Sequence, residues 1–205
     1  MTRSLADAVR VAGALSFVAV TPRGGVATAL MALVLLGLTL LRVVGVPPAM
    51  DLATGALLVA AAWFALSGAY ERYAGLDSVV HLAATGLVAV AAHRALVAAR
   101  VLPPRDDPRL LRPGEGAVIA IVCLGLAMAT LWEMGEWLGH TYLDPAIRTG
   151  YDDTIGDLAS GGLGALLAGL LSLRRSPRAR RPAEPAVPSE PSGHATPSLS
   201  GTRHG

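Results

Sequence analysis

The chain has 205 residues, of which 53% are hydrophobic and 16% are charged, and its mean hydropathy is +0.52. In soluble domains charged residues make up closer to a quarter of the chain, so this composition excludes an ordinary soluble domain and indicates a membrane protein. The net charge of +2 is expected to lie in loops and tails, and it does not indicate nucleic-acid binding. The single cysteine, Cys123, excludes an intramolecular disulfide and a cysteine-based metal cluster.

Apolar segments recur along the whole chain. The first, residues 5–20, is interrupted by Asp7 and Arg10, and it either crosses the membrane or lies in the interface. Later segments reach the ~20 apolar residues that a spanning helix needs, and they are residues 26–46, 52–70, 78–101, 116–138 and 154–173. The sequence therefore predicts an all-α transmembrane helical bundle of 5–6 spans, and we favour six.

The arginines orient this bundle. They concentrate in residues 94–115 and in the segment after the last span, and these two regions lie on one side because two spans separate them. The positive-inside rule makes that side the cytoplasm. All basic residues are arginine, a bias typical of high-GC bacteria, so we expect a multi-pass protein of the bacterial plasma (inner) membrane.

The C-terminal segment differs in composition from the rest of the chain. From residue 176 it is dense in proline, serine and glycine and has almost no large apolar side chains. Such a segment cannot bury enough surface to offset its chain entropy. We therefore expect a transmembrane domain over residues 1–175 and a disordered cytoplasmic tail over residues 176–205, whose arginines favour anionic membrane lipid.

Carboxylates and imidazoles near or within the spans need an explanation, because a charge at mid-bilayer costs at least ~2.5 kcal/mol. Three groups of them occur, each on one helical face because its members are three or four residues apart. The groups are Asp77 with His81, Glu133 with Glu136 and His140, and Asp153 with Asp157. All three fall at the outward ends of their helices, so we expect them to form one outward-facing polar pocket.

Each group also has a purely structural explanation. Asp77 or Asp153 can cap the N-terminus of a helix, and His81 can make an interhelical hydrogen bond. Glu133 and Glu136 are harder to explain in this way, because two carboxylates three residues apart repel unless they are protonated, paired or bridged by a cation.

If the pocket forms, three uses remain open. It can hold a divalent cation, relay protons, or bind a cationic or hydroxylated head group. The residues proposed as metal ligands are Asp77, His81, Glu133, Glu136 and Asp157.

Two further features concern packing. Small residues recur every four positions in the last span, a pattern that lets another helix approach closely, and they are Gly156, Ser160, Gly164 and Ala168. His93 and Arg94, at the cytoplasmic side of their span, are expected to extend toward the membrane interface.

The sequences DSVVHL, LWEMGEWLG and YDDTIGDLASGGLGALLAG resemble, in this order, the Asp-xxx-His, Glu-xx-(Gln or Glu) and Asp-rich motifs of the VanZ-like and YjdF-like small bacterial membrane proteins. The resemblance covers residues 71–169, and an Asn is usual in the last helix of VanZ-like sequences. VanZ-like sequences usually have Gln at the position of Glu136, so the chain stands nearer the YjdF-like side. The resemblance implies a polytopic inner-membrane protein without an established reaction, and VanZ-like proteins are associated with reduced susceptibility to teicoplanin-type antibiotics.

Three classes of function follow. The first is a binding or transport protein for a cation or for a lipid or lipid-linked envelope-precursor head group. The second is a metal-dependent membrane enzyme acting on a lipid-linked substrate, with Glu133 or Asp157 as general base; the sequence has no nucleophile motif and no Gly-rich phosphate loop to support it. The third is a structural membrane subunit in which the acids only cap helices and pair with one another.

Overall fold

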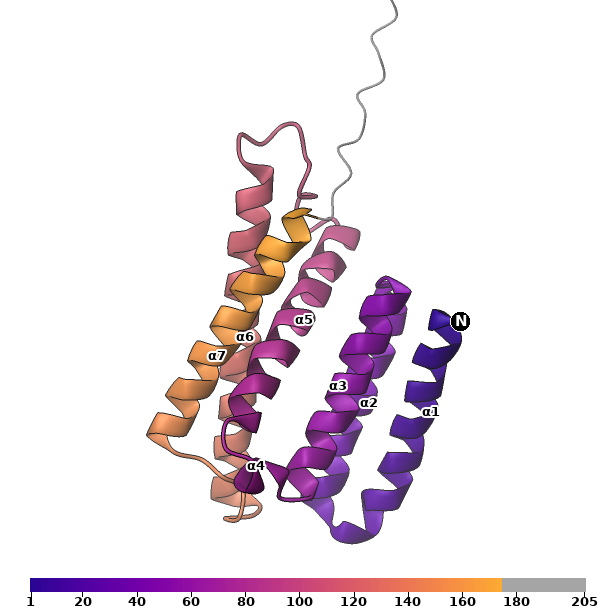
Figure 1. Cartoon of the computed structure of the whole chain (residues 1–205), viewed down its shortest axis with the longest axis vertical. Helices are drawn as coiled ribbons and strands as arrows, with labels where there is room; N and C mark the ends of the chain where they lie inside the picture. Colours follow the sequence, from indigo (N-terminus) through magenta and orange to yellow (C-terminus); the bar gives the residue numbers. More distant parts are fainter. Residues whose placement is uncertain (175–205) are drawn as a thin grey trace, which may run out of the picture. The chain divides into compact units, whose positions relative to one another are not determined.

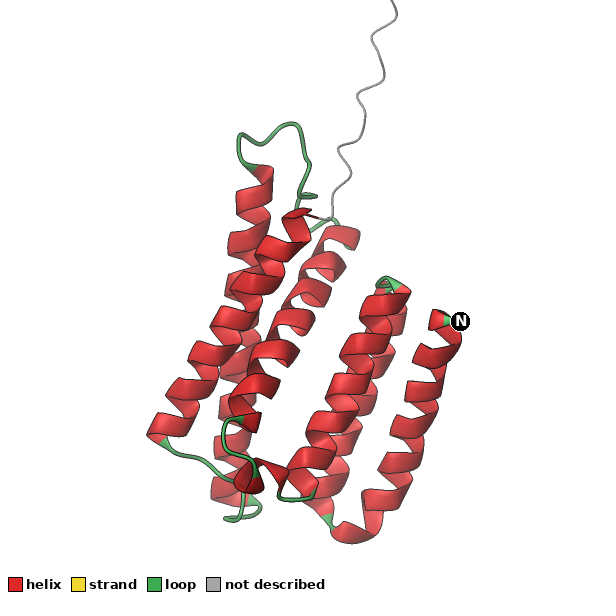
Figure 2. Ribbon diagram, in the orientation of Figure 1, coloured by secondary structure: helices red, strands yellow, loops and turns green. Residues whose placement is uncertain are grey.

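The computed structural model describes residues 1–174, and in this part of the chain the regular structure is entirely helical (Figure 2). Six helices are long and apolar enough to cross a membrane, which confirms the predicted all-α helical bundle, and the first of them contains residues 5–20. They are α1 (Thr2–Val20), α2 (Gly25–Val44), α3 (Pro48–Leu66), α5 (Leu76–Ala98), α6 (Pro113–Tyr142) and α7 (Tyr151–Arg174). The tail predicted over residues 176–205 lies outside the described residues.

Short elements join these helices at their ends. A 3-10 turn, η1 (Thr21–Arg23), links α1 to α2, and the short helix α4 (Ala69–Arg72) precedes α5. Between α2 and α3 the chain turns at Gly45, whose φ of 68° is a conformation that glycine adopts without strain. α3 then begins at Pro48, earlier than the apolar run at residue 52 predicts, and this start brings Asp51 into its first turn.

The helices pack in two groups of three, α1 with α2 and α3, and α5 with α6 and α7 (Figure 1). Residues such as Val20, Met31 and Leu38 fill the core of the first group. Successive spanning helices run in opposite directions, and each group holds an odd number of them. The first helix of the second group, α5, therefore begins at the end of the bundle opposite to the end where α1 begins.

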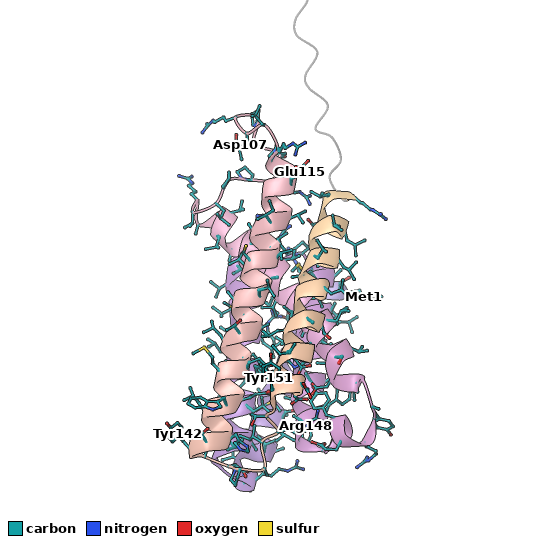
Figure 3. All side chains as sticks on the ribbon, turned by 90° about the vertical axis from the view of Figure 1, so that its left-hand side faces the viewer. Met1, Asp107, Glu115, Tyr142, Arg148 and Tyr151 are labelled. Atoms are coloured by element: carbon teal, nitrogen blue, oxygen red, sulfur yellow. The ribbon has the colours of Figure 1, made fainter. Side chains whose placement is uncertain are left out.

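The two ends of the bundle differ in charge. One end holds the α2–α3 turn, the α5–α6 loop and the last turn of α7 (Figure 1), and this arginine-rich end carries Arg3, Arg42, Arg94, Arg100, Arg105, Arg109, Arg112 and Arg174. The other end holds η1, α4 and the α6–α7 loop, and we call it the acidic end. Figure 3 shows Asp107 and Glu115 at the first end, and Tyr142, Arg148 and Tyr151 toward the second.

Helices α5, α6 and α7 meet along stripes that repeat every fourth residue. The stripes are Asp77, His81, Thr85, Ala89 and His93 on α5, Ile121, Gly125, Ala129 and Glu133 on α6, and Asp157, Gly161, Ala165 and Gly169 on α7. Their middle parts consist mostly of small residues, and a Cβ atom on Gly125 would lie 2.5 Å from the Cβ of Ala165. Their ends at the acidic end of the bundle are polar, so close packing brings these polar groups together.

The backbones of α5 and α7 touch at one point. A Cβ atom on Gly164 would lie only 1.9 Å from the carbonyl oxygen of Leu82, so no larger residue fits there. Of the predicted small-residue stripe, Gly164 and Ala168 face α5 near Gly86. Ser160 is half-buried, and Gly156 is exposed with no heavy atom within 4 Å of a Cβ added there.

His93 is buried rather than extended toward the interface. It is 7% exposed, whereas its neighbour Arg94 is exposed as expected. The reason is its register, because His93 continues the four-residue stripe by which α5 faces its neighbours.

Candidate functional site

Three of the predicted site residues form a compact group at the acidic end. The Nε2 atom of His81 lies 3.5 Å from Oδ1 of Asp77 and 3.7 Å from Oδ2 of Asp157. One potential ligand atom from each residue lies within 4.8 Å of the other two. Asp77 and His81 are one turn apart on α5, and the close α5–α7 contact brings Asp157 to them. We call these three residues the Asp-His cluster.

The cluster is largely shielded from solvent, and its three side chains are only loosely in contact with one another. Asp157 is 4% exposed, and the side chains of His81 and Asp77 are 12% and 25% exposed. The distances of 3.5 and 3.7 Å between Nε2 of His81 and the two carboxylates are too long for good hydrogen bonds. Asp77 does not act as a helix cap, because α5 is capped by Gly75 without a side-chain hydrogen bond.

Glu133 on α6 is a further buried acid, and it is not among the residues whose ligand atoms all lie within 4.8 Å of one another. It is 9% exposed, and its Oε1 atom has no hydrogen-bond partner among the described residues. Glu133 also lies within Coulombic range of Asp157. Leaving a buried carboxylate oxygen without a partner is costly unless the group is protonated or held by a cation.

Tyr70 of α4 lies within Coulombic range of acids from all three helices of the second group. Its hydroxyl donates a hydrogen bond to the carbonyl oxygen of Ala61 at 3.1 Å. The pKa of the Tyr70 phenol is raised above its usual range by burial first, and then by the charges of three acids. These acids are Asp77 on α5, Glu136 on α6 and Asp157 on α7. The sequence places Tyr70 near the membrane boundary but does not predict its proximity to the acids.

The other predicted residues are held by partners outside the cluster. Glu136 accepts a hydrogen bond from Nε1 of Trp132 at 2.9 Å. Nδ1 of His140 lies 2.6 Å from the carbonyl oxygen of Ile147, in the α6–α7 loop. Asp153 accepts a hydrogen bond from the guanidinium of Arg148 in the same loop, and this bond raises the pKa of Arg148. His140 and Asp153 therefore hold the α6–α7 loop against the helices that precede and follow it.

A second buried ionic group lies in the first helix group, and the sequence analysis does not predict it. Nη2 of Arg10 on α1 donates to both carboxylate oxygens of Asp51 on α3, at 2.7 and 2.9 Å. Nη1 of Arg10 also bonds Asp7 at 3.2 Å, and Asp51 is only 7% exposed. In the sequence, the feature that could have indicated this pair is an arginine within one predicted span, Arg10, together with an acid just before another span, Asp51.

The donor atoms of the Asp-His cluster define what it can do chemically. Carboxylate oxygens and an imidazole nitrogen are ligands for divalent cations, and the same groups can accept and release protons. The burial of these side chains lowers the local dielectric and strengthens the charge interactions in the site.

Comparison with known proteins places the chain in a family but assigns no activity. No curated protein and no solved structure matches it. The model of a family described as "Predicted membrane protein (DUF2238)" matches residues 5–178, a region that includes most of α1 and every later helix. The chain therefore belongs to this family of predicted membrane proteins.

Proposed function

We propose that this membrane protein binds a divalent cation at the Asp-His cluster, and that Glu133 supplies a further carboxylate oxygen. The observation that carries the proposal is the buried Oε1 atom of Glu133, which has no hydrogen-bond partner in the described part of the chain. Its neighbour Asp157 belongs to a set of three ligand atoms within 4.8 Å of one another.

The balance of charge supports a cation. In the first helix group, the permanently charged guanidinium of Arg10 neutralises Asp51. In the second group, the base is His81, whose charge depends on a bound proton. The two carboxylates of the cluster thus share one imidazole, and Glu133 adds a further acid within Coulombic range of Asp157. A doubly charged ion would relieve the repulsion among these carboxylates in a low-dielectric site.

The donor set narrows the choice of ion. An imidazole nitrogen suits Zn²⁺ and Fe²⁺, and carboxylate oxygens suit Mn²⁺, Mg²⁺ and Ca²⁺. Mn²⁺ and Zn²⁺ are therefore the informative probes for a mixed site. A proton shared among the same side chains is the competing interpretation, and it predicts that neither metal binds.

We further propose that the arginine-rich end faces the cytoplasm of a bacterial inner membrane, so that the site faces outward. The positive-inside rule supports this orientation. The motif resemblance to VanZ-like and YjdF-like proteins supports a role at the cell envelope. A cation held at this face can in turn hold the phosphate of a lipid or lipid-linked envelope-precursor head group.

Calorimetric titration of the full-length protein tests the proposal. The protein is purified in detergent without a polyhistidine tag, treated with a chelator, and titrated with Mn²⁺ and with Zn²⁺. We expect one high-affinity ion per chain, and its loss in Asp157→Asn and in His81→Gln. Asp152→Asn is the matched control, because Asp152 is an exposed acid in the first turn of the same helix.

Two results would overturn the proposal. One is a wild-type protein that binds neither ion, and the other is Asp157→Asn with the affinity of the wild type. Helix content by circular dichroism and yield in the membrane fraction show that each variant is folded.

A further inference from the structure

A second polar site lies at the arginine-rich end, where α1, α2 and α3 meet. A hollow of about 220 Å³ opens there. Its charged lining residues are Arg3 of α1, Arg42 of α2 and Asp51 of α3, and Gly45 and Pro48 of the α2–α3 turn complete its wall. The hollow is separate from the Asp-His cluster, which lies at the other end of the bundle.

The charge of this hollow is positive. Asp51 is its only lining carboxylate, and both of its oxygens already accept hydrogen bonds from Arg10. Within residues 1–174, Arg3 and Arg42 have no ion-pair partner. Two guanidinium groups that line one small hollow repel each other, and an anion between them turns this repulsion into attraction.

The N-terminus of α3 also lies at the hollow. This helix begins at Pro48 without a side-chain cap, and the one acid in its first turn, Asp51, already accepts hydrogen bonds from Arg10. At the end of α2 the N–H groups of Gly45 and Val46 bond to the carbonyl oxygens of Arg42 and Leu41, which are two of its last four carbonyl groups. The positive end of the α3 dipole adds to the charge of the two arginines.

We infer that this hollow binds a phosphate-bearing anion through Arg3 and Arg42. The planar guanidinium group matches the oxygens of a phosphate in pairs, which is why arginine is preferred at such sites. The hollow lies at an end of the bundle, where the head groups of a surrounding bilayer lie. The same chemistry fits the head group of an anionic lipid and a soluble phosphate compound.

Competition binding separates these two sources. The full-length protein in neutral detergent is incubated with spin-labelled phosphatidylglycerol or phosphatidylcholine, and inorganic phosphate is added as the competitor. We expect retention of phosphatidylglycerol over phosphatidylcholine. Release by millimolar inorganic phosphate identifies a soluble phosphate site, and resistance to it identifies a lipid site.

Arginine variants decide whether the hollow is responsible. The double variant Arg3→Gln/Arg42→Gln is expected to retain at least about tenfold less phosphatidylglycerol than the wild type, because charge-assisted hydrogen bonds are lost. Arg109→Gln is the matched control, because Arg109 is an exposed arginine of the α5–α6 loop at the same end. Arg42→Lys keeps the charge and is expected to retain partial binding.

The inference is overturned if the double variant retains phosphatidylglycerol as the wild type does. It is also overturned if Arg109→Gln causes an equal loss, because the binding would then be general attraction to a basic surface. Helix content by circular dichroism and yield in the membrane fraction show that the double variant remains folded.

Discussion

The Nε2 atom of His81 on α5 lies 3.7 Å from Oδ2 of Asp157 on α7. The two helices reach this distance because glycine at position 164 lets the backbone of α7 rest on the carbonyl oxygen of Leu82, the residue after His81. The close approach at Gly164 therefore helps to determine where the polar ends of the two helices meet.

Replacing Gly164 by alanine tests this dependence. The added Cβ atom would lie 1.9 Å from the carbonyl oxygen of Leu82, so the two helices must separate. We expect the free energy of unfolding to fall by ~1–3 kcal/mol, the usual effect of overpacking. We also expect weaker cation binding. Thermal unfolding followed by tryptophan fluorescence measures the first effect.

Gly156→Ala is the matched control for this substitution. Gly156 lies on the same helix, is exposed, and has nothing within 4 Å of an added Cβ atom. Alanine favours a helix over glycine by about 1 kcal/mol, so Gly156→Ala is expected to be neutral or slightly stabilising. Equal unfolding temperatures for the two variants would contradict the close contact.

Glu133→Gln is expected to change stability and affinity in different directions. Glutamine has the shape of glutamate without its buried charge, so the metal-free protein should unfold at the same or a higher temperature. Cation affinity should fall at least about tenfold, because a charged ligand is lost. Unfolding curves with chelator and with Mn²⁺ measure both effects, and unchanged stabilisation by Mn²⁺ would exclude Glu133 as a ligand.

Arg10→Ala is expected to destabilise the first helix group. The substitution leaves the buried carboxylate of Asp51 without its partner, and such a loss costs about 3–5 kcal/mol. Asp7→Asn should cost less than ~1 kcal/mol, because the Asp7 side chain is 52% exposed. Adding Asp51→Asn to Arg10→Ala should restore part of the lost stability. If the changes in unfolding free energy of the two single variants simply add in the double variant, the pair is not coupled.

Cation binding is expected to weaken as the pH falls. Carboxylate and imidazole ligands bind a metal only when they are deprotonated, so protons compete with the ion and binding releases them. Titrations in buffers of different ionisation enthalpy count the released protons. Asp77→Asn should release fewer protons than the wild type, and an affinity independent of pH would contradict ligation by these groups.

The spanning helices could be predicted because length and hydropathy determine them almost alone. The face shared by Asp77 and His81 also follows from helical geometry, since residues four apart lie on one side. Asp51 could not be placed in the same way. Its helix starts at Pro48, before the apolar run begins, and its partner Arg10 is on another helix.

The exact membership of the site also depends on tertiary structure. His140 and Asp153 have the same spacing signal as the clustered residues, but the α6–α7 loop supplies them with Ile147 and Arg148 as partners. No local pattern shows that this loop folds back onto its own helices. The choice of Asp157 as the partner of His81 likewise depends on the α5–α7 contact at Gly164.

Electron spin-echo spectroscopy of the Mn²⁺-loaded protein tests the central claim most directly. A coordinated imidazole nitrogen modulates the echo of the bound Mn²⁺, whereas a site built from oxygen alone does not. We predict nitrogen modulation in the wild type and in His140→Gln, and its loss in His81→Gln. Wild-type protein without nitrogen modulation, or modulation that persists in His81→Gln, would contradict cation binding at the Asp-His cluster.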